Sequence, residues 1–306
     1  MKYGRPIRVA TRSSALSLVQ AQEAIKTLRK ALPEETFEII TLSSEGDLRK
    51  SDSLSAMKRG MFAKRIEQAV LEEEADLAVH SAKDVPSDLP DGLIISGYTK
   101  RLDPRDVLVH EGLENLMQLP SGFRIGTSSR RRACQVLNLR PDINIIPVRG
   151  NVDTRLSLPG NGEVDGVILA AAGLIRLNRS KDISAYIPVK ESIPDVGQGA
   201  LLLQCRDDDT FPLLKSATDI KTQIAVCAER AFLFAIHGEC SSPVAAYAKI
   251  SGDEIIVKAM AGTTDGKEIY RTEVKGSIRQ PAEAGLNAVQ SLLDSGAADL
   301  IGPNYD

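Results

Sequence analysis

The 306-residue chain is poor in residues that several classes of protein need. It contains no tryptophan, three histidines and four cysteines, and no two cysteines have the spacing Cys-x-x-Cys. Zinc sites draw on histidine and cysteine at short spacings, so we expect no metal site. The cysteines are expected to be reduced thiols, as in a reducing compartment.

Long hydrophobic runs are also missing. No stretch approaches the about 20 apolar residues that cross a bilayer. The opening sequence MKYGRPIRVATRSSALSLVQ lacks the basic and then apolar segments of an export signal. We therefore expect a cytoplasmic protein with no membrane partner. A composition with 42% hydrophobic and 26% charged residues is typical of a folded protein of two or three domains.

Apolar strands alternate with amphipathic helices over the first two thirds of the chain. IRVAT leads to a helix over about residues 15–30, and the pattern continues to DGVILAAAGLIRL. This alternation predicts α/β units with mostly parallel sheets. Beyond about Thr222 we expect a helix, three alternating strands within 246–276 and a last helix over about 280–295. That pattern indicates a smaller α+β domain.

Positive charge is concentrated in one segment, although the net charge is only -3. The segment from Arg124 to Arg155 holds seven arginines and two acids. Three of the arginines (Arg130, Arg131, Arg132) open a helix, where each cation opposes the helix dipole by about 0.3–1 kcal/mol. A bound carboxylate or phosphate would reverse that penalty. A solvated basic face is the alternative.

Other arginines follow other predicted strands. Arg12 follows IRVAT, Arg149 follows INIIPV, and Arg155 lies in the first turn of the next helix. Ligands collect beyond the carboxyl ends of strands in open α/β sheets. The segment has few aromatic residues on which bases could stack, so nucleic acid is a poor partner. A small organic acid with several carboxylates fits better.

One cysteine differs from the other three in context. Cys240 lies in HGECSSP, on a loop that we expect to be exposed. Cys134, Cys205 and Cys227 lie in apolar surroundings and are expected to fill the core. An accessible thiol can act as a nucleophile or a covalent anchor, and an ordinary loop cysteine is the alternative.

Asp84 ends the stretch ADLAVHSAKD, just before a loop that contains proline. Strand alternation predicts His80, Ala82 and Asp84 on one side of the strand and Ser81 and Lys83 on the other. A carboxylate beyond a strand end can stabilise a developing cation or move a proton. A turn or cap aspartate is the alternative, and His80 is expected to be structural.

The loop SEGDLRKSDSLSAMKRGMF is long, polar and rich in small residues. This composition is typical of a mobile lid. Lys58 and Arg59 lie in it and are available for an anionic ligand.

Taken together, nine motifs in order along almost the whole chain resemble the porphobilinogen deaminase (hydroxymethylbilane synthase) family. They are VATRSSALSLVQAQ, SEGD, GMFAKRIEQAVLEEEADLAVHSAKDVP, RLDPRDVLV, GTSSRRRACQ, RPDINIIPVRGNVDTRL, DGVILAAAGLIRL, DVGQGALLLQCR and AERAFLFAIHGECSSPVAAYA.

The resemblance implies a fold of three domains. Two α/β domains similar to type II periplasmic binding proteins would flank a cleft, and a small α+β domain would follow. By this resemblance we expect domain 1 to comprise 1–100 and 196–217, domain 2 to comprise 101–195, and domain 3 to comprise 218–306.

The resemblance also implies an activity. The family is a transferase of tetrapyrrole biosynthesis that joins four porphobilinogen molecules head to tail, releases ammonia and hydrolyses off hydroxymethylbilane. The chain grows on a dipyrromethane cofactor held by a thioether, which by motif match falls on Cys240. Each pyrrole carries an acetate and a propionate, which accounts for the arginines. A monomer is expected by the same resemblance.

The same match assigns roles to further residues. Asp84 falls on the catalytic carboxylate that contacts pyrrole N–H groups and stabilises the azafulvene-like cation. Phe62 falls on an aromatic residue beside the active site. The carboxylate-binding positions are Arg12, Lys83, Ser129, Arg131, Arg132, Arg149 and Arg155, with Thr127, Ser128 and Gln198 as further contacts.

The chain departs from the family pattern around these positions. MKRG stands where the family has a glycine-rich lid sequence, Glu239 precedes Cys240, and Arg130 replaces an apolar residue. A carboxylate beside the thiol opposes its ionisation. The alternatives to an active enzyme are a non-catalytic protein that binds an anionic solute and an inactive paralogue of the same fold.

Overall fold

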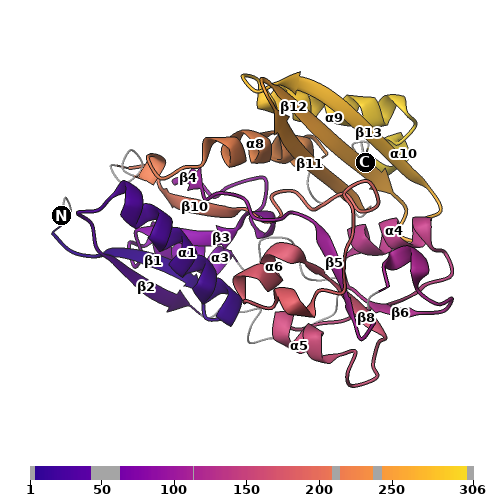
Figure 1. Ribbon diagram of the computed structural model, residues 1–306. Coiled ribbons are helices and arrows are strands. Elements are labelled where there is room, and N and C mark those ends of the chain that lie inside the picture. Colours follow the sequence, from indigo (N-terminus) through magenta and orange to yellow (C-terminus); the bar gives the residue numbers. More distant parts are fainter. Residues whose placement is uncertain (1–3, 43–62, 113, 209–213, 237–242, 302–306) are drawn as a thin grey trace. The chain divides into compact units, whose positions relative to one another are not determined.

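The computed structural model describes residues 4–42, 63–112, 114–208, 214–236 and 243–301. The chain forms two compact units. The first contains residues 1–102 and 200–223, and the second contains residues 103–199 and 224–306. Figure 1 labels most of their helices and strands.

The first unit is built on a five-stranded sheet with the order β2-β1-β3-β10-β4. Strand β1 is parallel to β2 and β3, whereas β10 runs antiparallel to β3 and β4. The five strands are β1 (Ile7–Arg12), β2 (Phe37–Leu42), β3 (Leu77–Ser81), β4 (Leu93–Tyr98) and β10 (Leu201–Arg206). Four strands therefore point the same way, as the alternation of strands and helices predicts, and β10 is the exception.

Helices pack on both faces of this sheet because neighbouring strand residues point to opposite faces. Val9 and Leu77 pack with Leu28 of α1 (Ala15–Ala31). Ala10 and Ala78, one residue further along, pack instead with α3 (Lys64–Leu71). Strands β1 and β3 are thus covered on both sides, which fixes the position of their ends.

The second unit contains a similar five-stranded sheet, with the order β7-β6-β8-β5-β9. Strand β6 is parallel to β7 and β8, and β5 runs antiparallel to β8 and β9. The strands are β5 (Asp106–His110), β6 (Arg124–Gly126), β7 (Asn144–Ile146), β8 (Gly166–Ala170) and β9 (Ala185–Tyr186). Helix α4 (Arg130–Leu139) packs on one face, and α5 (Val152–Ser157) and α6 (Ala171–Arg176) on the other.

The second unit also contains the antiparallel sheet β11-β12-β13. Its strands are β11 (Val244–Ser251), β12 (Glu254–Gly262) and β13 (Ile269–Ser277). The helices that pack with it are α8 (Ile220–Ala235), which belongs to the second unit from Ile224 on, α9 (Pro281–Asp294) and α10 (Ala298–Ile301). Gly285 of α9 lies so close to α8 that a Cβ atom would come within 2.1 Å of the Ala228 carbonyl oxygen. Only glycine permits that approach.

The predicted fold class is confirmed. Two α/β sheets and a smaller α+β part are present, and the three strands and last helix predicted near the C-terminus are found within a few residues of the expected bounds. The domain boundaries near residues 100, 195 and 217 stay a prediction. Among the helices in the described ranges, none combines the length and apolar character that crossing a membrane needs.

Asp76, just before β3, ties that strand to β1. Its carboxylate accepts hydrogen bonds from Arg5 Nη1 (2.7 Å) and from the backbone N–H of Arg8 (2.9 Å). Burial alone would raise the pKa of Asp76, but the hydrogen bonds from Arg5 and Arg8 outweigh it and hold that pKa well below its usual range.

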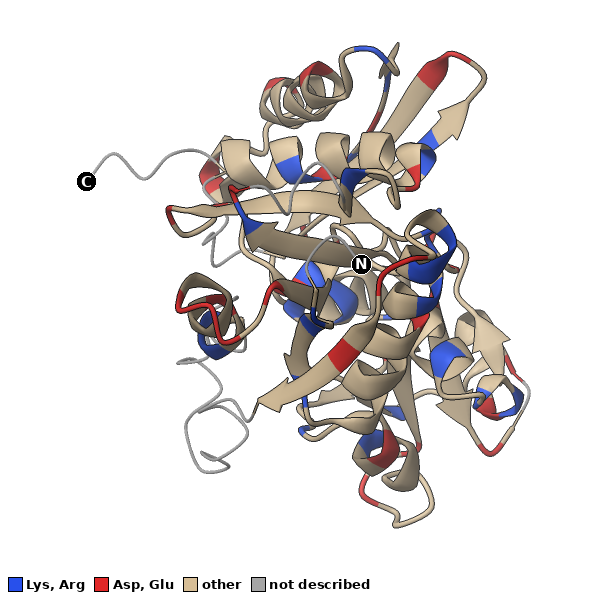
Figure 2. Ribbon diagram, turned by 90° about the vertical axis from the view of Figure 1, so that its left-hand side faces the viewer, with Lys and Arg blue, Asp and Glu red and all other residues tan. Residues whose placement is uncertain are grey.

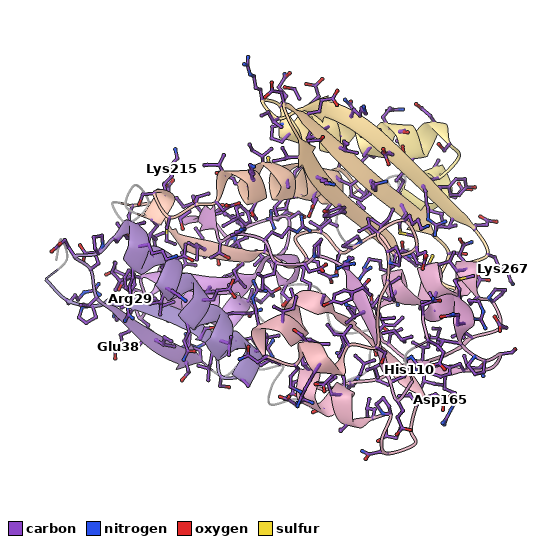
Figure 3. All side chains as sticks on the ribbon, in the orientation of Figure 1. Arg29, Glu38, His110, Asp165, Lys215 and Lys267 are labelled. Atoms are coloured by element: carbon purple, nitrogen blue, oxygen red, sulfur yellow. The ribbon has the colours of Figure 1, made fainter. Side chains whose placement is uncertain are left out.

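We predict that Asp76→Asn lowers the free energy of unfolding by about 1–2 kcal/mol at pH 7, allowing for the solvent exposure of Arg5. A depressed carboxyl pKa stabilises the fold above the unfolded value of 3.8 and less as pH falls below it. Urea unfolding at pH 7 and pH 3 should therefore show the loss shrinking at pH 3. Glu38→Gln, on β2 and labelled in Figure 3, is the exposed control. An equal loss at both pH values would contradict the role of the charge.

Candidate active site

Asp84 and Arg12 come together at one edge of the first sheet. Strands β1 and β3 are parallel neighbours, so their carboxyl ends meet at the same edge. Arg12 is the last residue of β1, and Asp84 closes a short 3-10 helix, η2 (Ala82–Asp84), that follows β3. Both residues line one hollow of about 30 Å³ with Ser17 and Gln20 of α1. A hollow of that size holds a water molecule.

The strand alternation predicted through Asp84 is wrong. Strand β3 ends at Ser81, whose partner Leu201 is the first residue of β10, so the ladder has no further pair. The chain then turns into η2, where Ala82 is buried and donates its N–H to the Ala200 carbonyl (3.0 Å). Asp84 is exposed as a result. It lines the hollow from this turn, not from the strand.

A buried polar chain lies beneath this edge. The His80 Nε2 atom is 3.0 Å from the Gln204 Oε1 atom, and Gln204 Nε2 donates to a carboxylate oxygen of Glu67 (3.1 Å). All three residues are buried. Burial lowers the pKa of His80 to about 4 and raises the pKa of Glu67. The structural role expected for His80 agrees with these contacts, but the sequence did not indicate its partners Gln204 and Glu67.

In the second unit, hydrogen bonds fix the three residues that precede α4. The Ser129 hydroxyl caps the helix by accepting from the Arg132 N–H (3.4 Å). The Ser128 hydroxyl donates to the Val148 carbonyl (2.6 Å), and the Thr127 hydroxyl accepts from the Ser129 N–H (3.2 Å). The predicted contact residues Thr127 and Ser128 thus hold the loop between β6 and α4.

Arg131 and Arg132 share one buried carboxylate. Arg131 Nη1 lies 2.7 Å from Asp106 Oδ2, and Arg132 Nη2 lies 2.8 Å from Asp106 Oδ1. The Gln198 amide donates to the same carboxylate (3.0 Å) and to the Pro104 carbonyl (2.7 Å). Burial alone would raise the pKa of Asp106, but the charges of the two arginines outweigh it and hold that pKa well below its usual range.

The sequence did not identify Asp106 because the direction of β5 was unknown. Asp106 is the first residue of β5, and in the antiparallel register it lies opposite Ala170, the last residue of β8. The start of β5 therefore lies at the carboxyl end of β8, which is the edge where β6 also ends. Two guanidinium groups pair with one carboxylate there, so this group of three side chains carries one net positive charge, and Asp195 is a further acid whose charge acts on Arg131.

Arg155 adds another positive charge near Arg132. It is half-buried on α5, and its Nε donates to the Gly150 carbonyl (2.9 Å). Burial and the charge of Arg132 lower the pKa of Arg155. Within the described residues, no carboxylate lies within salt-bridge distance of Arg155. Arg149, which follows β7, is exposed.

The remaining predicted site residues are Lys83 and five residues near Phe62 and Cys240. Lys83 lies next to Asp84 on η2 and is half-buried. Cys240, Phe62, Lys58 and Arg59, together with Glu239, lie outside the described residues. In the described part of the chain, no group of three or more histidine, cysteine, aspartate or glutamate side chains could hold a metal ion.

The expected core positions of the remaining cysteines are confirmed for two of the three. Cys134 and Cys205 are buried, and Cys227 is half-buried. Burial raises the pKa of Cys134 and of Cys205 to about 11 and also raises that of Cys227, so these thiols are poor nucleophiles.

Charge of both signs is otherwise mixed over the described parts of each unit (Figure 2). Ion pairs such as Arg124 with Asp165 (2.6 Å; Asp165 is labelled in Figure 3) balance arginines that lie away from Asp106. The excess around Arg131, Arg132 and Arg155 is therefore local.

We predict that Asp106→Asn destabilises the protein by about 3–5 kcal/mol, because Arg131 and Arg132 would stay buried without their carboxylate. Chemical denaturation measures this loss. Asp142→Asn is the matched control, because it removes the carboxylate from a surface pair with Arg140 and should cost far less. Equal losses of unfolding free energy in the two variants would contradict the prediction that the shared buried carboxylate contributes more to stability than the surface one.

Comparison with known proteins finds relatives that match almost the whole chain. Residues 7–212 match the family profile "Porphobilinogen deaminase, dipyromethane cofactor binding domain", and residues 223–294 match "Porphobilinogen deaminase, C-terminal domain". The porphobilinogen deaminase of Brevibacillus brevis is 43% identical over 298 residues, which is 96% of each chain. That of Clostridioides difficile is 43% identical over 291 residues, 94% of this chain and 97% of the relative.

Solved structures with similarity to the chain include periplasmic solute-binding proteins. One from Pseudomonas putida F1, with bound D-glucuronate, is 12% identical, with a TM-score of 0.41 over 72% of this chain and 79% of that one. The two profiles together cover most of the sequence, and the curated relatives match over nearly its whole length. The chain belongs to the porphobilinogen deaminase family.

Proposed function

We propose that this chain is an active hydroxymethylbilane synthase. It joins four porphobilinogen molecules head to tail, releases one ammonia for each, and then hydrolyses off the linear tetrapyrrole. The observation that carries the proposal is the local excess of positive charge around Arg155, Arg131 and Arg132. A substrate that brings two carboxylates on every pyrrole would neutralise it.

The residues present fit the dipyrromethane cofactor of the family. The Arg131 Nε atom is buried and has no hydrogen-bond partner within the described residues. Together with Arg132, Arg149, Arg155 and the Ser129 hydroxyl it forms a set of donors suited to carboxylates. The cofactor supplies the covalent primer on which the product is assembled, and by the motif match Cys240 would anchor it.

The arginines bind and orient the acidic side chains of the pyrroles. Arg131 and Arg132 keep fixed positions because Asp106 and the Ile193 and Ile168 carbonyls hold their guanidinium groups. Fixed donors lose little entropy when an anion binds. The Arg155 Nε donates to the Gly150 carbonyl, which leaves the two Nη groups to donate to a carboxylate of the ligand.

Asp84 acts on the reacting pyrrole. An ionised carboxylate only accepts hydrogen bonds, so it accepts from a pyrrole N–H. As ammonia leaves porphobilinogen, positive charge develops on the ring, and the negative carboxylate stabilises that charge in the transition state. Its place in η2, at an exposed strand end, leaves Asp84 accessible to a substrate.

Two alternatives use the same fold without this chemistry. A protein that only binds an anionic solute would use the arginines but give no role to Asp84. An inactive paralogue would keep both features and fail at turnover. The presence of Asp84 beside Arg12 in one hollow favours the enzyme. We further propose, from the family resemblance, a cytoplasmic monomer with the three domains bounded near residues 100, 195 and 217.

We predict that Asp84→Asn lowers kcat by about a thousandfold and changes KM little, because the amide keeps the shape and loses the charge. Ammonia release from porphobilinogen and the mass of the tetrapyrrole formed measure the effect.

Asp88→Asn, an exposed aspartate on the loop that follows, is the matched control and should keep wild-type kcat. Binding without any tetrapyrrole from the wild-type protein would contradict the proposed function. An unchanged kcat in Asp84→Asn would contradict only the role of Asp84.

A further inference from the structure

The proposed mechanism leaves one buried titratable residue of the first unit unused. His80 is buried, yet it lines the same hollow as Asp84 and Arg12. It lies on β3, four residues before Asp84, and is paired in register with Leu202 of β10. A buried polar side chain that belongs to a hydrogen-bond network and lines an active site can act on the catalytic residues there.

The contacts of His80 indicate which ring nitrogen carries the proton. The NH₂ group of Gln204 donates to the Glu67 Oε1 atom at 3.1 Å. The Gln204 carbonyl then faces His80 Nε2 at 3.0 Å and needs a donor. The Nε2 atom therefore carries the proton, and Nδ1 keeps a lone pair.

The charge of the ring follows from its surroundings. Burial lowers the pKa of His80 to about 4, so the ring is neutral at neutral pH. The charged groups around it are Arg12 from β1 and Asp84 from η2, which line the hollow, and Glu67 from α3, which acts through Gln204 and is itself near Lys64. Helix α1 contributes only the uncharged Ser17 and Gln20 to the hollow.

His80 and Asp84, each of which carries an acceptor, thus line one small hollow. A water molecule has two hydrogens and can donate to both. The hollow, about 30 Å³, has room for such a water. Donation to Asp84 favours its ionised form, which is the form that stabilises a cation.

We propose that His80 is a positioning residue for Asp84. Its ring, held by Gln204 as the neutral Nε2–H tautomer, presents Nδ1 to the hollow and orients a water that donates to the Asp84 carboxylate. This inference rests on the proposed function, because it assigns Asp84 the part described above. His80 touches no substrate and acts only through the water and Asp84.

The tautomer is measured without any turnover. Long-range ¹H–¹⁵N NMR spectra of protein labelled with ¹⁵N-histidine contain signals from only three histidines. The signal lost in His80→Gln identifies His80. We expect a neutral Nε2–H ring that does not titrate between about pH 5.5 and 9. A protonated ring at pH 7, or an Nδ1–H tautomer, would overturn the proposal whether or not the protein is an enzyme.

Two substitutions separate positioning from packing. In His80→Asn the side-chain oxygen can replace Nδ1 as an acceptor, but the contact with Gln204 is lost. In His80→Gln the amide nitrogen can replace Nε2 toward Gln204, but the acceptor facing the hollow is lost.

We expect His80→Gln to lower kcat about tenfold at pH 7, with KM within about twofold, and to move the acidic limb of the kcat profile up by about one pH unit. For His80→Asn we expect about a threefold loss of kcat and an acidic limb at the wild-type position.

A purely structural role predicts the reverse order, with His80→Gln the milder change and no movement of the limb in either variant. His110→Gln is the control for histidine replacement, because His110, labelled in Figure 3, lies on β5 of the second unit. Its Nε2 atom lies 3.0 Å from the Glu114 carbonyl oxygen. This replacement should leave kcat and the limb unchanged. If the wild-type protein forms no tetrapyrrole, the proposed function fails, and the NMR spectrum still decides the state of His80.

Discussion

The sharing of the Asp106 carboxylate by Arg131 and Arg132 is the interaction on which the site in the second unit depends. Three charged side chains are buried together, which is tolerable only because they are paired and hydrogen-bonded. The pairing fixes the two guanidinium groups at the start of α4 and leaves one positive charge in excess. A carboxylate ligand would neutralise the positive charge that Asp106 leaves. Arg155 adds to this positive charge.

The two units use the same geometric device. In each, parallel strands bring their carboxyl ends to one edge of the sheet, and an antiparallel strand begins at that edge. This strand is β10 in the first unit and β5 in the second. The first unit gathers Arg12 and Asp84 in this way, and the second gathers Ser129, Arg149 and Asp106. The backbone thus brings residues that are distant in sequence into two small clusters, one with an accessible carboxylate beside an arginine and one dominated by guanidinium groups.

Much of this arrangement could be predicted from the sequence. The α/β alternation, the three antiparallel strands and the last helix follow from periodicity and turn residues, and the arginines after strand ends follow from the general behaviour of open sheets.

Strand direction could not be predicted, because an apolar strand has the same pattern whether it runs parallel or antiparallel. Asp106 was therefore missed. The same limit applies to Gln204 on β10, whose partners His80 and Glu67 are distant in sequence. The turn at Ala82 was missed because the end of a ladder depends on where the partner strand begins.

The central claim is that this chain carries a pyrrole primer and elongates it. The most direct measurement is the intact mass of the purified protein, before and after incubation with porphobilinogen, beside that of a Cys240→Ser variant. The account predicts an excess of two pyrrole units on the wild-type chain, further pyrrole units after incubation, and no excess on the variant. A wild-type chain at its sequence mass that stays unmodified with porphobilinogen would contradict it.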